Sequence, residues 1–160
     1  MVNDDDLKHL RRCIELAAQA LEGGDTPFGS VLVGADGTVL AEDRNRIVST
    51  GDPTRHPELE LARWAATRLT PEERAAATVY TSGEHCPMCS AAHGWVGLGR
   101  IVYVASSAQL TEWLEELGVP PSRVRPLPVR EVAPGVRIEG PVPALVEEIR
   151  ALHRRAHGSV

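Results

Sequence analysis

Two short motifs in the sequence carry residue types that bind transition metals. Cys86 and Cys89 stand three positions apart in a C-P-M-C segment, and His56 opens an H-P-E segment earlier in the chain. On a helix, a spacing of three residues puts both sulfur atoms on one face. At a helix N-terminus the macrodipole also lowers the thiol pKa and favours the thiolate that a metal requires. Two thiolates provide half of a tetrahedral zinc site, and His56 offers a third ligand.

The remaining residues of these motifs favour a catalytic zinc site. No fourth protein ligand is evident, and three ligands with one open position are typical of catalytic zinc, since water can occupy that position and be acidified to about pH 7. Glu58 follows His56 by two residues and could act as general base on that water, then pass the proton to a ring and to departing ammonia. H-x-E followed by C-x-x-C is the general pattern of zinc deaminases.

Each motif taken alone has another interpretation. A C-x-x-C after a strand also occurs in redox domains of the thioredoxin type, which would need a Cys86–Cys89 disulfide and no zinc. A non-catalytic zinc domain would need a fourth ligand and no free carboxylate at position 58. A glutamate in the first turn of a helix is also favoured by the helix dipole alone. The four residues together favour the catalytic zinc site.

The elements that must position these motifs alternate between helices and strands. Hydrophobic periodicity predicts helices over residues 4–21, 57–69, 86–98, 109–117 and 143–157. Strands are predicted over residues 30–33, 38–41, 77–81 and 101–105, with one or two short strands near 127–132 and 136–139. Residues 45–55 lack periodicity and are predicted to form a loop. This order predicts an α/β sheet with helical layers on both faces, and both motifs at helix N-termini.

The composition limits the partners and the location that we expect. A chain of 160 residues has the usual size of one domain, so we expect a single deaminase domain over residues 1–160. The net charge of −5 provides no general attraction for nucleic acid or anionic membranes. The acidic N-terminus is unlike a signal peptide, no apolar run approaches the roughly 20 residues that span a bilayer, and three cysteines provide no disulfide framework. We therefore expect a cytoplasmic protein that acts on a small molecule.

Four segments of the chain also carry a family resemblance. They are Thr26-Pro27-Phe28-Gly29-Ser30, Asn45, Asp52-Pro53-Thr54-Arg55-His56-Pro57-Glu58 and Tyr80-Thr81-Ser82-Gly83-Glu84-His85-Cys86-Pro87-Met88-Cys89. With them, residues 7–105 resemble the cytidine-deaminase-like superfamily, nearest the branch of bacterial guanine deaminases and tRNA adenosine deaminases. The resemblance implies a three-layer α/β/α sandwich with a five-stranded mixed sheet, in a homodimer or larger assembly. It makes His56, Cys86 and Cys89 the expected ligands of Zn²⁺ and Glu58 the expected proton shuttle.

The resemblance also implies contacts with the substrate. Asn45 falls where the purine-binding asparagine of the family hydrogen-bonds the base. Phe28 and Trp95 are candidates for stacking on the substrate ring, with core packing as the alternative. Ser82 is the fourth candidate for a contact with the substrate. Trp113 could close the pocket or contact a partner subunit. The helix after Cys86, including Trp95, is the candidate dimer surface.

Three departures from the family pattern bear on the substrate. Proline replaces the usual alanine at position 57, and His85 replaces the usual proline before the first cysteine; we expect His85 at the solvent edge, with a contact to the site as the alternative. Beyond residue 105 the acidic motif for a purine amino group is not obvious, although Glu115 or Glu116 could substitute. We therefore expect a free guanine-like purine or a related aminated azine as substrate, with cytosine-like rings as a further option. A tRNA adenosine deaminase is the alternative, for which the basic last helix would contact phosphates.

Overall fold

The computed structural model of the protein describes residues 1–158. In chain order the helices and strands are α1 (Asp4–Glu22), β1 (Gly29–Val33), β2 (Val39–Arg44), α2 (Ile47–Thr50), α3 (Pro57–Arg68), α4 (Pro71–Ala76), β3 (Thr78–Gly83), α5 (Pro87–Val96), β4 (Ile101–Ala105), α6 (Ser107–Glu116), α7 (Val129–Val132), β5 (Ile138–Glu139) and α8 (Pro143–His157). Among these residues, no helix is both long and apolar enough to cross a membrane.

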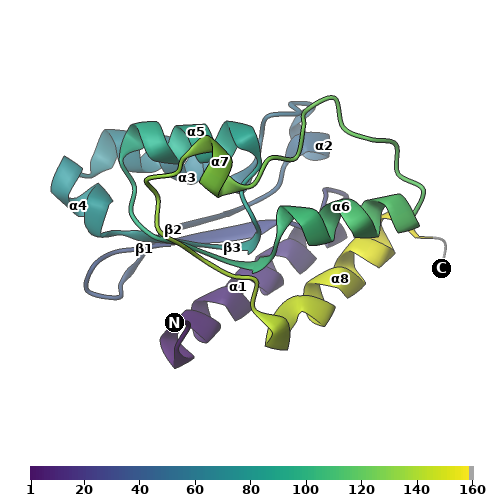
Figure 1. The fold of residues 1–160 in the computed structure, drawn as a ribbon, viewed down its shortest axis with the longest axis horizontal. Helices are drawn as coiled ribbons and strands as arrows, with labels where there is room; N and C mark the ends of the chain where they lie inside the picture. The colour runs from purple at the N-terminus through teal and green to yellow at the C-terminus, as the bar shows by residue number, and fades with distance from the viewer. Residues whose placement is uncertain (159–160) are drawn as a thin grey trace.

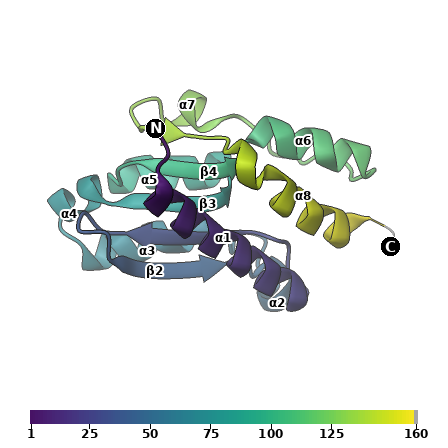
Figure 2. The same cartoon turned by 90° about the horizontal axis from the view of Figure 1, so that it is seen from below.

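The strands form one mixed sheet. Its five strands lie in the order β2-β1-β3-β4-β5, with β1 antiparallel to β2 and β3, and β4 parallel to β3 and β5. Figure 1 shows α3 and α5 on one face of the sheet and α1 and α8 on the other, and Figure 2 shows α6 beside α8. The predicted three-layer α/β/α sandwich with a five-stranded mixed sheet is confirmed.

Strand alternation divides the hydrophobic core into two layers. Val31 and Val33 of β1 point into the layer beneath α1 and α8, whereas Leu32 points into the layer beneath α3 and α5. On β3 the same alternation sends Tyr80 to the first layer and Val79 to the second. The central strands are therefore apolar on both faces, as expected for strands covered by helices on either side.

Both motifs lie at helix N-termini, as predicted. His56 is the N-cap residue of α3 and Cys86 is the N-cap residue of α5, each with an extended backbone. Each is followed by a proline, whose missing N–H is not required in the first turn of a helix. Because α5 follows β3 directly, Cys86 lies at the carboxyl end of β3.

A buried charge cluster ties the start of α1 to the sheet. Arg100 donates to both carboxylate oxygens of Asp6, at 2.8 and 3.0 Å, and to Glu139 at 2.7 Å. The hydroxyl of Tyr80 donates to Asp6 at 2.6 Å. Burial opposes ionisation of Asp6, but the hydrogen bonds from Arg100 and Tyr80 outweigh it and lower the pKa of this carboxyl. The cluster joins α1, β3 and β5 around one guanidinium.

Two local predictions are wrong, and one helix was missed. Residues 129–132, predicted as strand, form the single-turn helix α7, which begins directly after Pro128. The predicted loop 45–55 contains α2, because Asp25 accepts the backbone N–H groups of Val48 and Ser49 at 2.9 and 2.8 Å. The short helix α4 was not predicted, although Thr70 and Glu73 form a capping box at its start.

Candidate metal centre and active site

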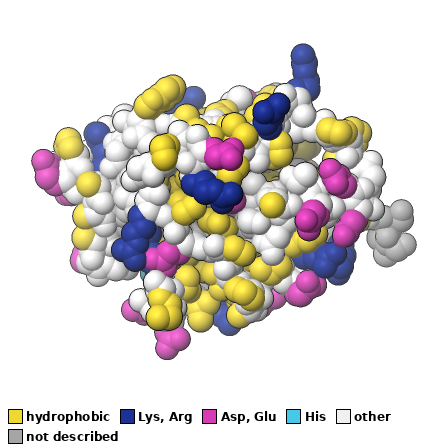
Figure 3. Space-filling model, viewed as in Figure 1, with side chains coloured by type: hydrophobic (Ala, Val, Ile, Leu, Met, Phe, Trp, Pro, Cys, Tyr) yellow, Lys and Arg dark blue, Asp and Glu magenta, His cyan; other side chains and the backbone are white. Residues whose placement is uncertain are grey.

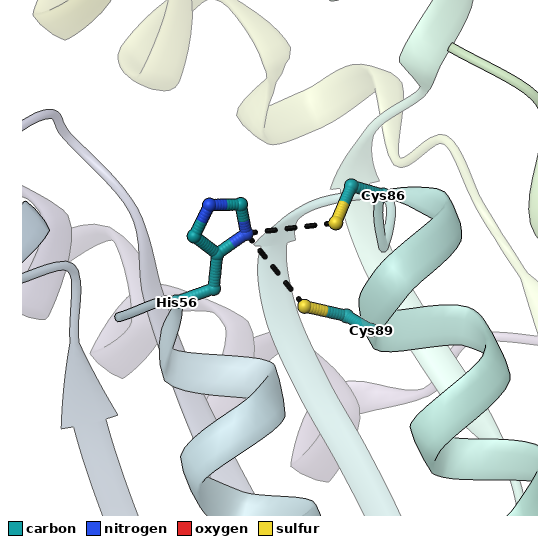
Figure 4. Close-up of side chains that lie close together, drawn as sticks. All are labelled: His56, Cys86 and Cys89. Carbon is teal, nitrogen blue, oxygen red and sulfur yellow. Dashed lines mark hydrogen bonds between the residues drawn. The ribbon is translucent and has the colours of Figure 1, made fainter. Parts of the chain in front are cut away.

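His56, Cys86 and Cys89 converge between α3 and α5. The Nδ1 atom of His56 lies 3.5 Å from Sγ of Cys86 and 3.7 Å from Sγ of Cys89 (Figure 4). All three ligand atoms lie within 4.8 Å of one another. The three residues are separated by up to 33 positions in the chain, so the fold itself brings them together.

These separations fit one metal ion better than they fit hydrogen bonds. In a tetrahedral zinc site, a nitrogen ligand lies about 2.05 Å and a sulfur ligand about 2.3 Å from the metal. The nitrogen and the sulfur are then about 3.6 Å apart. A single ring nitrogen offers only one hydrogen or one lone pair, so Nδ1 cannot make two full hydrogen bonds at once. Both cysteines are free thiols, which leaves both sulfur atoms available to a metal. The donor set of one nitrogen and two sulfurs therefore fits zinc.

The electrostatics of the cluster also favour a bound cation. The hydrogen bond from Cys89, followed by that with His56, lowers the pKa of Cys86 to about 4. The thiolate of Cys86 and burial raise the pKa of Cys89, because a second negative charge is opposed there. The same hydrogen bond with Cys86 raises the pKa of His56. A divalent cation would remove the repulsion between the two thiolates.

Glu58 lies beside this cluster in the first turn of α3. Its side chain is buried, with 7% exposed, and Oε1 accepts hydrogen bonds from Ser30 at 3.0 Å and from Thr81 at 3.1 Å. Burial is the largest influence on the pKa of Glu58 and raises it, while the charge of His56 acts in the opposite direction. A buried carboxyl with a raised pKa next to a metal site is suited to proton transfer.

The hydroxyls of Ser30 and Thr81 were not among the predicted site residues. Along β3, alternation sends Thr81 to the same face as Val79, beneath α3, and Ser82 to the opposite face. The structure accordingly brings Thr81 to Glu58, while the Ser82 hydroxyl accepts the backbone N–H of Gly29 at 3.2 Å. Ser82, a predicted substrate contact, is therefore not brought to the metal cluster, because a one-residue step along a strand reverses the face.

Asn45 is buried at the start of the 45–55 loop. Its backbone N–H donates to the carbonyl oxygen of Phe28 at 3.0 Å, and its side-chain oxygen accepts the N–H of Ile47 at 3.0 Å. Because the amide oxygen already accepts this bond, the NH₂ group is the donor that Asn45 can offer to a base. Asp25 holds α2 and thereby the loop that carries Asn45.

Phe28 is half-buried between the end of β3 and α8. Its ring meets that of His153 edge to face at a centroid distance of 5.1 Å, and a Cβ atom at Gly83 would lie 3.3 Å from Phe28 Cε1. His153 is buried, so this residue of the basic last helix is not available to phosphates as the tRNA alternative requires. Trp113 is also buried and lies 6.1 Å from His153, which places it in the core beneath α8 and not over a pocket.

Two further predictions, for Trp95 on α5 and for His85 just before this helix, need correction. Trp95 is 89% exposed, so the alternative of core packing is wrong; it lies six residues and about 9 Å along the helix from Cys89. His85 is 1% exposed and does not lie at the solvent edge. Its two ring nitrogens have no hydrogen-bond partner among residues 1–158, and its ring lies 5.4 Å from that of His93.

Glu84, between β3 and Cys86, anchors the C-terminal third of the chain. Its two carboxylate oxygens accept the N–H groups of Ser107 and Val129, the first residues of α6 and α7, at 2.9 and 2.8 Å. A carboxylate at two helix N-termini satisfies donors that have no partner within the helices. Sequence reasoning missed this role because position 84 gains it only through contacts more than 20 residues away.

The chain is similar in sequence to known deaminases. A family model for the cytidine and deoxycytidylate deaminase zinc-binding region matches residues 3–105. A "Probable cytosine deaminase" from Schizosaccharomyces pombe is 32% identical over 117 residues, which cover 73% of this chain and 70% of that protein. Guanine deaminase from Bacillus subtilis is 35% identical over 104 residues, covering 64% of this chain and 66% of that protein. A tRNA-specific adenosine deaminase from Agrobacterium fabrum is 37% identical over 89 residues, covering 56% of this chain and 58% of that protein.

Solved structures match over more of the chain. The structure of guanine deaminase from Nitrosomonas europaea superposes with a TM-score of 0.74 and 20% identity, covering 99% of this chain and 87% of that one. The structure of the Bacillus subtilis guanine deaminase matches with a TM-score of 0.58 and 27% identity, covering 84% of this chain and 92% of that one. The fold of the last 50 or so residues, which the family model does not reach, thus has a counterpart in the first of these structures.

Proposed function

The chain belongs to the cytidine and deoxycytidylate deaminase family through its zinc-binding region, and from this we propose that it hydrolytically removes an exocyclic amino group from a free nucleobase-type ring. One observation carries the proposal: the His56, Cys86 and Cys89 ligand atoms lie at separations suited to one zinc ion, with the buried carboxyl of Glu58 beside them. A redox pair would have no use for His56 and Glu58, and a structural zinc site would need a fourth protein ligand.

We assign His56, Cys86 and Cys89 as the zinc ligands and Glu58 as the proton carrier. A zinc ion held by these three residues would make a water molecule acidic enough to serve as nucleophile near neutral pH. Glu58 would accept a proton from the attacking water and deliver it to a ring nitrogen as the new C–O bond forms. It would then carry the second proton of the water to the amino group, so that the C–N bond breaks and ammonia leaves a ring carbonyl behind.

Several features support a small heterocycle as the substrate. The net charge is −5, and on the face shown in Figure 3 acidic and basic side chains are interspersed without a continuous basic area. Near the loop that carries Asn45, the guanidinium of Arg46 is paired with Asp43 at 3.1 Å and that of Arg55 with Glu60 at 3.6 Å. These arginines are thus engaged by carboxylates, which argues against recognition of a phosphate.

Among small rings we propose a guanine-like purine or a related aminated azine first, and a cytosine-like ring second. Asn45 offers NH₂ donors to acceptors on the edge of a flat ring, and purines and aminated azines present such acceptors beside the amino-bearing carbon. A backbone hydrogen bond from Asn45 to Phe28 holds the two residues side by side. The ring of Phe28 could therefore stack on the substrate ring. The named activities of the relatives, on guanine, cytosine and tRNA adenosine, define the classes that must be compared.

The experiment is to measure the initial rate of ammonia release from guanine, adenine, cytosine, a diaminotriazine, their available nucleosides and a tRNA substrate, at equal concentrations. We expect free bases to be turned over fastest and tRNA not to be converted. Inosine formation in tRNA with no turnover of any free base would favour the tRNA adenosine deaminase alternative. Absence of turnover on the whole panel by zinc-loaded protein would contradict the proposed function.

A further inference from the structure

Two buried hydroxyls surround one oxygen of Glu58. Ser30 on β1 and Thr81 on β3 are directly opposite each other in the antiparallel register, and neither has exposed surface. The Ser30 hydroxyl lies 3.0 Å from Glu58 Oε1, the Thr81 hydroxyl lies 3.1 Å from the same oxygen, and the two hydroxyls are 2.9 Å apart. Both hydroxyls are therefore within hydrogen-bond distance of Oε1, and neither forms a hydrogen bond with Oε2.

The surroundings make this pair unusual for a layer that is otherwise hydrophobic. The neighbouring positions on the same sheet face, Leu32 and Val79, are buried apolar residues packed beneath α3 and α5. An alanine and a valine at positions 30 and 81 would continue that apolar layer without polar groups to satisfy. Two hydroxyls in such a place need partners, because a buried hydroxyl without a hydrogen bond destabilises the fold. Their shared partner is the carboxyl of Glu58.

The hydrogens of the pair can be arranged in more than one way. Each hydroxyl has one hydrogen, and Thr81 has a second acceptor within reach, the carbonyl oxygen of Gly83 at 3.0 Å. While Glu58 is a carboxylate, both hydroxyls can donate to Oε1. When Glu58 carries a proton, the hydrogen of Thr81 can turn to Gly83 without movement of any heavy atom. The network can therefore hold the carboxyl in one orientation throughout a cycle of proton transfer.

We propose that Ser30 and Thr81 are positioning residues that fix Oε1 of Glu58 and leave Oε2 as the oxygen that carries protons between water and the substrate ring. This inference rests on the proposed role of Glu58 as proton carrier. Proton transfer requires the carrier within about 3 Å of its donor and acceptor, so a carboxyl free to rotate would spend much of its time in an unproductive orientation. The hydroxyl pair restricts that rotation from the side of the sheet.

The test compares variants that keep or remove each hydroxyl. Thr81→Val and Ser30→Ala remove one hydroxyl each, Thr81→Ser retains it, and Thr78→Val makes the same chemical change on the same strand away from Glu58. Steady-state rates of ammonia release are measured with guanine, or with the base from the panel above that is turned over fastest, on protein whose zinc content and melting temperature are known. We expect Thr81→Val and Ser30→Ala to lower kcat roughly ten- to hundredfold, the scale of one hydrogen bond to a charged group, with KM changed less than about threefold. Thr81→Ser and Thr78→Val should remain close to the unsubstituted protein.

A second readout separates positioning from general effects on the fold. In a Glu58→Gln background, Thr81→Val should cause little further loss, because both changes act on the same group. The inference is overturned if Thr81→Val and Ser30→Ala keep kcat within about twofold, or if Thr81→Val lowers the residual rate of the Glu58→Gln protein by the same factor as that of the unsubstituted protein. A fully active Glu58→Gln protein would exclude Glu58 as the proton carrier and would overturn this inference with it, although the release of ammonia would still support the proposed function. Active hydroxyl variants combined with an inactive Glu58→Gln protein would overturn this inference alone.

Discussion

At the residue scale, the predictability of the site depends on whether a role follows from residue type and spacing or from contacts between distant strands. His56, Glu58 and the two cysteines could be identified because their types and spacing already define a donor set and a base. Ser30 and Thr81 could not, because they lie 51 residues apart and meet only through the register of β1 and β3. His85 was misplaced because a polar residue before a motif has no periodicity that indicates burial.

The first prediction at this scale concerns the metal. Cys86→Ala or Cys89→Ala removes one of three ligands, so we expect the purified protein to lose its zinc and its ability to release ammonia. The unsubstituted protein should contain close to one zinc per chain, and a chelator should inactivate it until zinc is returned. Cys13→Ala is the matched control, since Cys13 is a buried core thiol on α1. Elemental analysis that finds full zinc in the Cys89→Ala protein would remove this cysteine from the ligand set.

The second prediction isolates the carboxyl of Glu58. Glu58→Gln keeps the size of the side chain and can still meet the hydroxyls of Ser30 and Thr81, so zinc content and melting temperature should change little. The amide cannot carry a proton between water and the ring, and we expect the rate of ammonia release to fall by roughly 10²–10⁴. Near-normal turnover by a zinc-loaded Glu58→Gln protein would exclude Glu58 as the proton carrier.

At the scale of the elements, the periodic helices and buried strands were predicted well because hydrophobic spacing determines them. The short helices were not, because they are too short for periodicity and depend on individual capping side chains: Asp25 for α2, Glu84 for α7 and the Thr70–Glu73 capping box for α4. The short strand predicted near residues 136–139 is present as β5, with two residues. Polar contacts between residues far apart in the sequence join elements to the sheet, as in the cluster around Arg100.

The third prediction concerns that cluster. Asp6→Asn removes the carboxylate that receives two hydrogen bonds from Arg100, and leaves a largely buried guanidinium with Glu139 as its remaining acidic partner. We expect the free energy of unfolding to fall by about 3 kcal/mol, since loss of one partner of a buried ion pair strands the other charge. As the control, Glu42→Gln breaks the exposed ion pair with Arg12. It should change the free energy of unfolding by less than about 1 kcal/mol. Urea unfolding of the three proteins provides the comparison, and equal effects of the two substitutions would contradict the prediction.

The fourth prediction uses His153, which α8 buries between Phe28 and Trp113. Burial lowers the pKa of His153 to about 4, below its ordinary value of 6.5. Between these two values the unfolded chain binds a proton that the folded chain does not, so stability falls as the pH decreases from 6.5 to 4. Over that pH range, His153 should lower the free energy of unfolding by about 3 kcal/mol. His153→Phe should weaken the pH dependence of urea unfolding in this window while leaving stability above pH 7 less affected; an unchanged dependence would show that His153 is not buried as a neutral ring.

At the scale of the whole molecule, the end of α5 places a large aromatic side chain on the surface. Among residues 1–158, Trp95 is the only aromatic side chain that is largely exposed, and it lies on α5 beside Gly94 and Gly97, which are also exposed. Aromatic side chains are enriched in the cores of protein interfaces, and neighbouring glycines permit a close approach of backbones. The helix that begins after Cys86 and carries Cys89 in its first turn thus presents an apolar end to solvent.

The fifth prediction is that a second copy of the chain covers this end of α5. A homodimer would bury Trp95 in each subunit, and an aromatic side chain of that size contributes roughly 150–250 Å² to an interface. We expect the protein to sediment as a dimer at micromolar concentration, and Trp95→Glu to weaken the association at least about thirtyfold, the effect of losing a central interface residue of about 2 kcal/mol. Val124→Glu introduces the same charge at another exposed apolar position and should leave the dimer intact. Because α5 begins at the zinc ligands, the Trp95→Glu monomer should also lose zinc to a chelator more readily than the dimer does. If the unsubstituted protein sediments as a monomer, this surface is excluded as a site of self-association.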